Sequence, residues 1–321
     1  MTDKLLKVNN LETSFFTKKG EIKAVRNISF SIDKGTIVGI VGESGSGKSV
    51  TSTSIIGLIK PPGRIKNGEV IFKNEDLLKK SNKEMNEIRG NNISMIFQDP
   101  MTSLNPVFTI GTQLIDILMT HKGLNKADAK AKAIELLSLV SIPSPEKRIN
   151  SYAHEFSGGM RQRVMIAMAL SCEPNLLIAD EPTTALDVTI QAQILDLMKD
   201  LNKKTQTSIM LITHDLGVVA ETCSKVIVMY GGMIMEEATV SDIFHNPKHP
   251  YTIGLLNSIP KSDANKKERL VPIDGTPVNL LNISDGCPFY DRCFKKSDVC
   301  KEKCPSYTNI NNDHRVMCWN V

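Results

Sequence analysis

The sequence lacks any apolar run long enough to cross a membrane, and it contains few aromatic residues. Nowhere do about eighteen apolar residues follow one another, and Met1 to Lys7 contains no apolar core of signal-peptide length. Aromatic residues make up 5% of the 321 residues, and the formal net charge of +4 comes without a dense Lys/Arg run. These features argue against a nucleic-acid groove and predict a soluble, cytosolic protein that reaches a membrane only through partners.

Cysteine is also scarce, since seven residues are too few for a disulfide scaffold in a chain of this length. Cys172 and Cys223 stand alone, whereas the other five lie between Cys287 and Cys318. A local cysteine cluster in a cytosolic chain indicates a metal or cluster site before it indicates disulfides. With 41% hydrophobic residues, the chain is long enough for one large α/β domain and an addition.

The most informative segment is a glycine-rich loop that reads G-E-S-G-S-G-K-S over residues 42–49. It follows an apolar, β-branched strand and opens into a helix, so its N–H groups face one point and the helix dipole adds positive potential. Lys48 then reaches the β- and γ-phosphates, and the Ser49 hydroxyl is placed to bind Mg²⁺. This loop is predicted to hold a nucleotide through Gly42, Ser44, Gly45, Ser46, Gly47, Lys48, Ser49 and Val50.

Ahead of the loop, residues 5–34 alternate apolar and polar positions with a turn signal at 18–21, which predicts a small antiparallel sheet. A further hairpin is expected at 68–74. Phe15 or Phe16 lies near the first turn, where one aromatic ring either stacks on the nucleotide base or simply packs.

Four polar residues end three short apolar strands further along the chain. Gln98 sits where it can contact Mg²⁺ or the attacking water. Asp180 is placed to hold the Mg²⁺ shell, and Glu181 is placed to polarise the water that attacks the γ-phosphorus. His214 is a candidate contact for the γ-phosphate that also orients this water.

Between these strands the period changes to that of amphipathic helices, which predicts a helical insertion from residue 110 to about 140. Ser157, Gly158 and Gly159 then stand at the start of another helix and form a second phosphate-sized nest. Asp187 is expected in a tight turn before a later helix. Because one nucleotide has one γ-phosphate, the second nest needs a different explanation.

The chain resembles the ATP-binding subunits of ABC transporters across roughly its first 260 residues. In that family two subunits pack head to tail, and the loop of one and the Ser-Gly-Gly nest of the other hold the same nucleotide. The signature departs from many relatives at Phe156 and Met160, which leaves its hydroxyl and backbone donors in place. The motifs that carry the resemblance are the phosphate loop, Gln98, Ser157 to Gln162, Asp180 with Glu181, Asp187 and His214.

Three further stretches look like the oligopeptide/dipeptide importer subfamily, which also contains nickel uptake systems. They are residues 99–106 (D-P-M-T-S-L-N-P), 186–193 (L-D-V-T-I-Q-A-Q) and 249–252 (H-P-Y-T). The resemblance implies an α/β, RecA-like P-loop core with an N-terminal antiparallel β subdomain and an inserted helical subdomain at about 100–165. It implies a nucleotide-binding domain over 1–260 and a small cysteine-containing C-terminal extension over 261–321.

Four of the tail cysteines, Cys287, Cys293, Cys300 and Cys318, match the C-terminal cysteine motif of that subfamily, and Cys304 is extra. Structural zinc sites usually pair cysteines two to four residues apart, but five and six residues separate the first three here. A four-cysteine [4Fe–4S] cluster tolerates such spacing and is supported by the resemblance. Zinc and free thiols remain open.

The resemblance implies an ATPase that uses ATP and Mg²⁺ to energise oligopeptide or dipeptide uptake from the cytoplasmic face of the membrane. Its implied partners are a second ATPase subunit, two membrane permease subunits and an extracellular or periplasmic peptide-binding protein. Nickel or nickel-chelate uptake is an alternative cargo, and an identical or a related second ATPase chain remains open. A non-transport ABC ATPase acting on DNA or the ribosome and a small-molecule P-loop kinase are alternatives from other classes.

Overall fold

A computed structural model describes residues 4–98, 104–184, 186–259, 272–281 and 283–321. The chain divides into two compact units. The loop unit comprises residues 6–31, 38–78 and 213–321, and the helical unit comprises residues 79–212 with the short pieces 4–5 and 32–37. The predicted segment 99–103, which opens the stretch D-P-M-T-S-L-N-P, and the predicted domain boundary at 260/261 lie outside the described residues.

An antiparallel sheet forms the first part of the loop unit, in the strand order β2-β1-β4-β5. β1 and β4 pair from Leu6 opposite Phe72 to Phe15 opposite Gly63. Alternating residues of β1 are buried, as expected for a strand with one face on the core. The predicted N-terminal antiparallel subdomain is confirmed. Its strands are β1 (Lys4–Thr17), β2 (Gly20–Asp33), β4 (Gly63–Phe72) and β5 (Glu75–Asp76).

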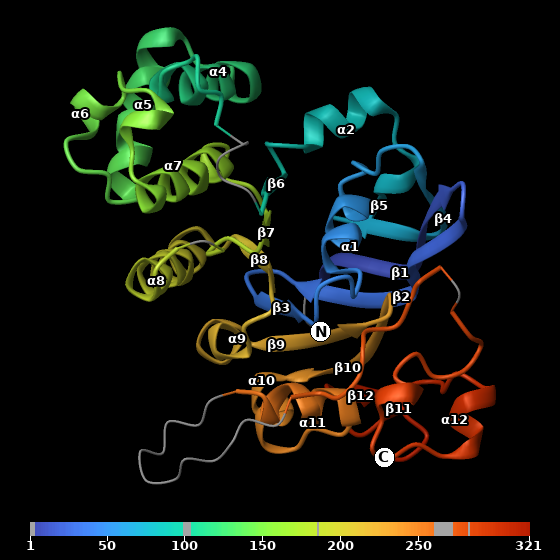
Figure 1. The fold of residues 1–321 in the computed structure, drawn as a ribbon. Coiled ribbons are helices and arrows are strands. Elements are labelled where there is room, and N and C mark those ends of the chain that lie inside the picture. The colour runs from blue at the N-terminus through green and yellow to red at the C-terminus, as the bar shows by residue number, and fades with distance from the viewer. Residues whose placement is uncertain (1–3, 99–103, 185, 260–271, 282) are drawn as a thin grey trace, which may run out of the picture. The chain divides into compact units, whose positions relative to one another are not determined.

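A second, mixed sheet in the loop unit has the order β11-β12-β10-β9-β3. β3 pairs with β9 in parallel, and β10 pairs with both β9 and β12 in antiparallel. The C-terminal extension therefore adds two strands to the edge of this sheet, which the sequence patterns did not predict (red end of the chain in Figure 1). The strands are β3 (Ile37–Val41), β9 (Lys225–Tyr230), β10 (Met233–Thr239), β11 (Thr308–Asn309) and β12 (Arg315–Val316).

The helices of the loop unit are short and follow the strands that carry site residues. α1 follows β3 through the glycine-rich loop, and α9 follows the strand Ser208–Thr213, β8. The helices are α1 (Lys48–Ile55), α9 (Leu216–Thr222), α10 (Val240–His245), α11 (Pro250–Asn257) and α12 (Asp298–Glu302), with the 3₁₀ turns η1 (Leu77–Lys79, at the unit boundary) and η3 (Tyr290–Arg292).

The helical unit contains a parallel sheet in the order β8-β7-β6. Every residue of β7 and β8 is buried, which explains their continuous apolar sequences. The strands are β6 (Ile93–Ile96), β7 (Leu176–Asp180) and β8 (Ser208–Thr213). The helices are α2 (Asn82–Ile88), α4 (Ile110–Lys122), α5 (Lys126–Leu139), α6 (Pro145–Arg148), α7 (Gly158–Leu170) and α8 (Val188–Thr205), with the 3₁₀ turn η2 (Ala153–Glu155).

The predicted helical insertion is a bundle in which α4, α5 and α7 pack against one another (green in Figure 1). On α5 the residues Ala129, Ala133, Leu136 and Leu137 are buried, which is the spacing of one helix face. The helix begins at Asn125, whose side chain accepts from two backbone N–H groups of the first turn. The predicted α/β fold with an inserted helical part is confirmed.

Candidate active site

The glycine-rich loop between β3 and α1 has a backbone that only glycine adopts without strain. Gly42, Gly45 and Gly47 have φ values of 152°, 78° and 104°. A Cβ atom on Gly42 would lie 2.1 Å from the carbonyl oxygen of Met229, and one on Gly47 would lie 2.5 Å from that of Ala24. The loop is therefore curled closely against neighbouring backbone, as a phosphate nest requires.

Lys48 lies folded over the start of this loop. Its side chain is 5% exposed, and its Nζ donates to the carbonyl oxygens of Gly42 (2.7 Å) and Glu43 (3.0 Å). The buried Ser46 Oγ has no hydrogen-bond partner within the described structure. A buried hydroxyl without a hydrogen-bond partner destabilises the fold unless a ligand accepts its hydrogen bond. A phosphate oxygen could accept this bond and also pair with the lysine, so the loop fits a phosphate group.

The two candidate aromatic residues differ in their surroundings. Phe15 lies opposite Gly63 on the neighbouring strand, where its ring covers the glycine backbone. The ring of Phe16 carries the guanidinium of Arg64 on one face, 4.0 Å from the ring centre. Phe15 therefore remains the candidate for stacking on the base, and this role stays a prediction.

His214 directly follows β8 and belongs to the loop unit, and its side chain is exposed. The next residue, Asp215, caps α9 by accepting from the N–H groups of Gly217 (2.8 Å) and Val218 (3.3 Å). The Thr213 hydroxyl accepts from the N–H of Asp215 at 3.0 Å. These hydrogen bonds fix the backbone on both sides of His214. Its exposed imidazole therefore extends from an ordered strand end.

In the helical unit the end of β7 brings Gln98 and Glu181 together. Gln98 Nε2 donates to Glu181 Oε2 at 2.9 Å, and the Thr184 hydroxyl donates to the same oxygen at 3.0 Å. Glu181 has a φ of 47°, a left-handed backbone that costs energy for a non-glycine residue. Such strain at the end of a buried strand is typical of a functional position. Asp180, directly before it, is buried.

The second nest begins α7 and packs on the helix that Asp187 begins. Ser157 is the N-cap residue of α7, and its Oγ accepts from the N–H of Met160 at 3.3 Å. A Cβ atom on Gly159 would lie 2.8 Å from Ile190 of α8, so the second glycine permits this close contact. Asp187 caps α8 through the N–H of Ile190 at 3.0 Å. The predicted nest and the predicted Asp187 turn are therefore neighbours.

Two residues that the sequence analysis did not single out strengthen this contact. Arg163 of α7 donates to Gln193 Oε1 of α8 at 2.9 Å and to the carbonyl oxygen of Val140 at 2.9 Å. Arg163 therefore links α7, α8 and the end of α5.

Gln162, which was predicted to bind nucleotide, is 2% exposed, and its Nε2 is buried without a partner in the described structure.

Phe15, the phosphate loop and His214 belong to the loop unit, whereas Gln98, Ser157, Asp180, Glu181 and Asp187 belong to the helical unit. Within the helical unit, Gln98 lies against Glu181, and Gly159 lies against Ile190 of the helix that Asp187 caps.

The tail cysteines are all free thiols. Cys287 and Cys300 are buried and joined by a bond from the N–H of Cys287 to the carbonyl oxygen of Cys300, at 2.8 Å. Burial, with smaller contributions from the nearby Cys304, Cys300 and Cys293, raises the pKa of Cys287 to about 12. The Cys287 thiol is therefore protonated at neutral pH in this arrangement.

The geometry of the tail does not support the expected iron–sulfur site. In the part of the chain that the structure describes, no group of three or more His, Cys, Asp or Glu side chains is placed to hold a metal ion. Cys300 Sγ instead lies 3.2 Å from the Ser297 hydroxyl, and Cys318 Sγ accepts from the N–H of Asn320 at 3.4 Å. Cys304, the extra cysteine, contacts Met233 of β10.

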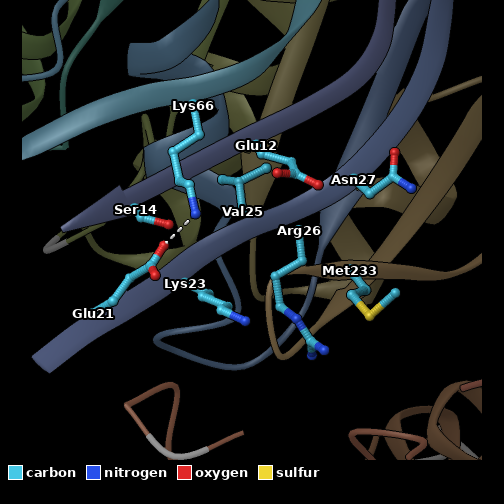
Figure 2. Close-up of a pocket in the computed structure, with 9 residues that line it drawn as sticks. All are labelled: Glu12, Ser14, Glu21, Lys23, Val25, Arg26, Asn27, Lys66 and Met233. Atoms are coloured by element: carbon cyan, nitrogen blue, oxygen red, sulfur yellow. Dashed lines mark hydrogen bonds and ion pairs between the residues drawn. The ribbon is translucent and has the colours of Figure 1, made fainter. Parts of the chain in front are cut away.

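A hollow of about 230 Å³ lies on the antiparallel sheet of the loop unit (Figure 2). Lys66 and Glu21 face each other across it with Nζ and Oε1 2.8 Å apart. Burial lowers the pKa of Arg26 at its edge, where Nη1 donates weakly to the carbonyl oxygen of Gly231. Lys66, Glu21 and Arg26 therefore already have partners within the protein.

Comparison with known proteins identifies the family of this chain. The family model described as "ABC transporter" matches residues 25–184, and the one described as "Oligopeptide/dipeptide transporter, C-terminal region" matches residues 235–300. The dipeptide transport ATP-binding protein DppD of Bacillus subtilis is 54% identical over 99% of this chain and 95% of its own length. The oligopeptide transport ATP-binding protein OppD of Haemophilus influenzae is 51% identical over 98% of this chain and 97% of its own length. The chain belongs to the oligopeptide/dipeptide family of ABC ATP-binding subunits.

Solved structures agree with this family. The dimeric, post-hydrolysis structure of the ATP-binding cassette MJ0796 bound to ADP and Pi has a TM-score of 0.66 and 28% identity, covering 73% of this chain and 98% of that one. CbiO1 of Clostridium perfringens, part of an ABC transporter complex, has a TM-score of 0.64 and 27% identity, covering 76% and 92%. This ABC ATP-binding subunit is therefore an ATPase that binds ATP and Mg²⁺. Within the described residues, no helix combines the length and apolarity needed to cross a bilayer.

Proposed function

We propose that this ABC subunit hydrolyses ATP to energise the uptake of oligopeptides or dipeptides across the cell membrane. The observation that carries the proposal is the match of residues 235–300 to the C-terminal region of oligopeptide/dipeptide transporters, in a chain whose residues 25–184 match the ABC transporter family. Relatives named for dipeptide and oligopeptide transport, which align over nearly the whole chain, support the same cargo class.

The loop unit binds the triphosphate in this proposal. The nest of N–H groups, the unpaired Ser46 hydroxyl and the Lys48 ammonium together supply donors and positive charge for the β- and γ-phosphates. Phe15 supplies a ring for the base. His214, held at the end of β8, contacts the γ-phosphate and orients the water.

The helical unit supplies the chemistry. Glu181 polarises the water that attacks the γ-phosphorus, and its hydrogen bond with Gln98 holds the carboxylate in one orientation until ATP is bound. Mg²⁺, when bound, neutralises charge on the phosphates. The oxygen groups assigned to it are the Ser49 hydroxyl, the Gln98 amide oxygen and the Asp180 carboxylate, which suit a hard cation.

The second nest acts on a partner's nucleotide. Ser157 and Gly158 are exposed at the start of α7, so their donors are open to a neighbouring molecule. In the proposed dimer, Ser157 of one subunit and Lys48 of the other hold one ATP, and Asp187 supports the nest through α8. The second ATPase is an identical or a related chain.

The proposed transporter adds two membrane permeases and an extracellular or periplasmic peptide-binding protein, with this chain at the cytoplasmic face. Movement passes to the permeases through residues 98–105, of which 99–103 are not described, and through the helical part. Val107 and Phe108, which precede α4, are 69% and 49% exposed and offer an apolar contact there.

Two experiments test this proposal. Purification of the tagged chain from solubilised membranes should bring integral membrane proteins with it, and recovery of DNA or ribosomes instead would contradict a transport role. Uptake of labelled peptide mixtures and of nickel chelates by a deletion strain then identifies the cargo. Peptide uptake that is lost and then restored by the gene supports the proposal, whereas loss of nickel uptake alone rejects a peptide cargo.

The finer assignment of the cysteine tail is separate. We propose no catalytic step for an iron–sulfur cluster or zinc, because the four matching thiols are not arranged as a ligand set. Iron and sulfide assays with visible absorbance of anaerobically purified protein decide this. Stoichiometric iron and sulfide would show that the thiols converge on a cluster, and colourless, iron-free protein would leave them as packing groups.

A further inference from the structure

Arg292 of the C-terminal extension reaches the phosphate-binding loop. It ends the turn η3, directly before Cys293, and its side chain is 5% exposed. Its Nη1 donates to Glu43 Oε2 at 2.6 Å, and its Nη2 donates to Glu43 Oε1 at 3.0 Å. Glu43 is the second residue of the loop, and 249 positions of sequence separate the two partners. This paired geometry is the strongest form of an arginine–carboxylate contact.

The other N–H groups of Arg292 are also used. Nε donates to the carbonyl oxygen of Asp274 at 2.9 Å, Nη2 to that of Ile273 at 3.2 Å, and Nη1 to the Tyr230 hydroxyl at 3.3 Å. Together with the two bonds to Glu43, these contacts engage all five N–H donors of the guanidinium. Arg292 is thus fixed in one position, and its bond to Glu43 is not that of a freely moving surface side chain.

Glu43 is held at three points. Arg292 binds its carboxylate, the Tyr251 hydroxyl accepts from its N–H at 2.9 Å, and Lys48 donates to its carbonyl oxygen at 3.0 Å. The residue that anchors the loop to the extension therefore also positions the lysine that the active site assigns to the phosphates.

The anchoring groups rest on a rigid aromatic cluster. Tyr230, Tyr251 and Phe289 are buried, and their ring centres lie 4.7 Å to 5.3 Å apart. Phe289 comes from the extension, and Tyr251 comes from α11. Contacts between aromatic rings at these separations resist displacement, so the cluster transmits the position of the extension to the loop.

We propose that Arg292 is a positioning residue for ATP binding, through which the C-terminal extension holds the start of the phosphate-binding loop in its binding conformation. A glycine-rich loop that is released from this anchor samples more conformations. If the binding conformation is then populated about one tenth of the time, the apparent Kd rises about ten-fold. The inference concerns ATP binding and does not depend on the transported cargo.

The test uses the full-length protein with a fluorescent ATP analogue for Kd and steady-state hydrolysis for KM and kcat. R292A should raise Kd and KM about ten-fold while kcat falls less than about three-fold, because the chemical groups are untouched. R292K should recover only part of the affinity, since lysine keeps the charge but lacks the paired donors. E43Q weakens the same contact from the loop side without altering the extension.

Arg315 provides a matched control. It is also an extension arginine bonded to a carboxylate, with its Nε 2.7 Å from Glu237 Oε2, and it also donates to the carbonyl oxygen of Ser29. None of these groups belongs to the phosphate loop. R315A should therefore loosen the extension and lower the melting temperature while Kd for ATP stays within about two-fold of the wild type.

Three outcomes would overturn the proposal. One is wild-type Kd and KM in folded R292A and E43Q proteins. Another is an equal rise in Kd for R315A, which would mean that any loosening of the extension has the same effect. The third is additivity of the two changes. The double variant R292A/E43A should bind ATP no less tightly than the single variant with the lower affinity. If the two losses of affinity instead add up, Arg292 does not act through Glu43.

Discussion

The loop unit and the helical unit hold their functional groups in opposite ways. In the loop unit Ser46 and Lys48 are buried, and tight glycine turns leave almost no freedom around them. In the helical unit Ser157 is exposed at a helix start, and Glu181 sits on strained backbone with a side chain held by Gln98 and Thr184. The contrast fits the proposed division, in which the loop unit mainly binds the nucleotide and the helical unit supplies the base and meets a partner.

The largest effect that tests this division is on the reaction. Glu181→Gln should keep ATP affinity and lose turnover by roughly 10²- to 10⁴-fold, because the amide cannot take a proton from water. The rate of ATP hydrolysis and the affinity for ATP are measured on the same protein preparation. Glu173→Gln, at an exposed acid of the same unit, serves as the control and should behave as wild type. Robust hydrolysis by Glu181→Gln would refute its role as base.

The next effect is on binding. Lys48→Ala removes charge-assisted phosphate contacts that contribute about 1.5–3 kcal/mol each, so ATP affinity should fall by roughly 100-fold. Equilibrium binding of an ATP analogue measures this, and Lys60→Ala, at an exposed lysine of the same unit, is the control. Unchanged affinity in a folded Lys48→Ala protein would mean that the loop does not bind the phosphates through this residue.

A smaller effect separates the two nests. Ser157→Ala should leave the ATP affinity of the isolated chain unchanged and lower turnover of the assembled pair about ten-fold, because one hydroxyl contact to the partner's nucleotide is lost. Ser138→Ala replaces another exposed serine of the helical unit and should change neither quantity. A weaker affinity in the isolated Ser157→Ala chain would show that the nest serves its own nucleotide.

A last effect, on stability and not on activity, concerns acid unfolding of the loop unit. Burial lowers the pKa of His249 to about 3 from the ordinary 6.5. Burial keeps the His249 imidazole neutral, and its Nδ1 accepts from the N–H of Tyr251 at 3.0 Å. The Glu236 carboxylate accepts from the backbone N–H of His249 at 3.0 Å and lies 2.7 Å from His314 Nε2.

Below pH 6.5 His249 is protonated in the unfolded chain but not in the folded protein. As the pH is lowered from 6.5 to about 3, the free energy of unfolding therefore falls by about 1.4 kcal/mol per pH unit. His249→Asn keeps an acceptor for the helix cap and should flatten this slope in thermal unfolding measured between pH 6.5 and 4. His154→Asn, at an exposed histidine of the helical unit, should leave the slope unchanged. Equal slopes in the wild type and both variants would contradict the assignment.

Local patterns predicted the parts of the site that are local in sequence. The strand, glycine turn and helix around Lys48 depend on neighbouring residues, and the same holds for the Ser157 cap and the acids that end β7. Arg163 and Arg292 were missed because an isolated arginine carries no pattern, and its partners, Gln193 and Glu43, lie 30 and 249 positions away. The iron–sulfur expectation came from cysteine positions, which do not reveal whether the thiols converge.

The amino-acid sequence by itself determined the order of strands and helices, the glycine loop and the identity of the groups placed at strand ends. These features follow from side-chain period and from the backbone freedom of single residues. Only the tertiary structure decided that the C-terminal extension adds strands β11 and β12 to a sheet edge and sets Arg292 against Glu43. Those pairings connect distant segments, and their energy depends on burial and geometry that exist only once the chain has folded.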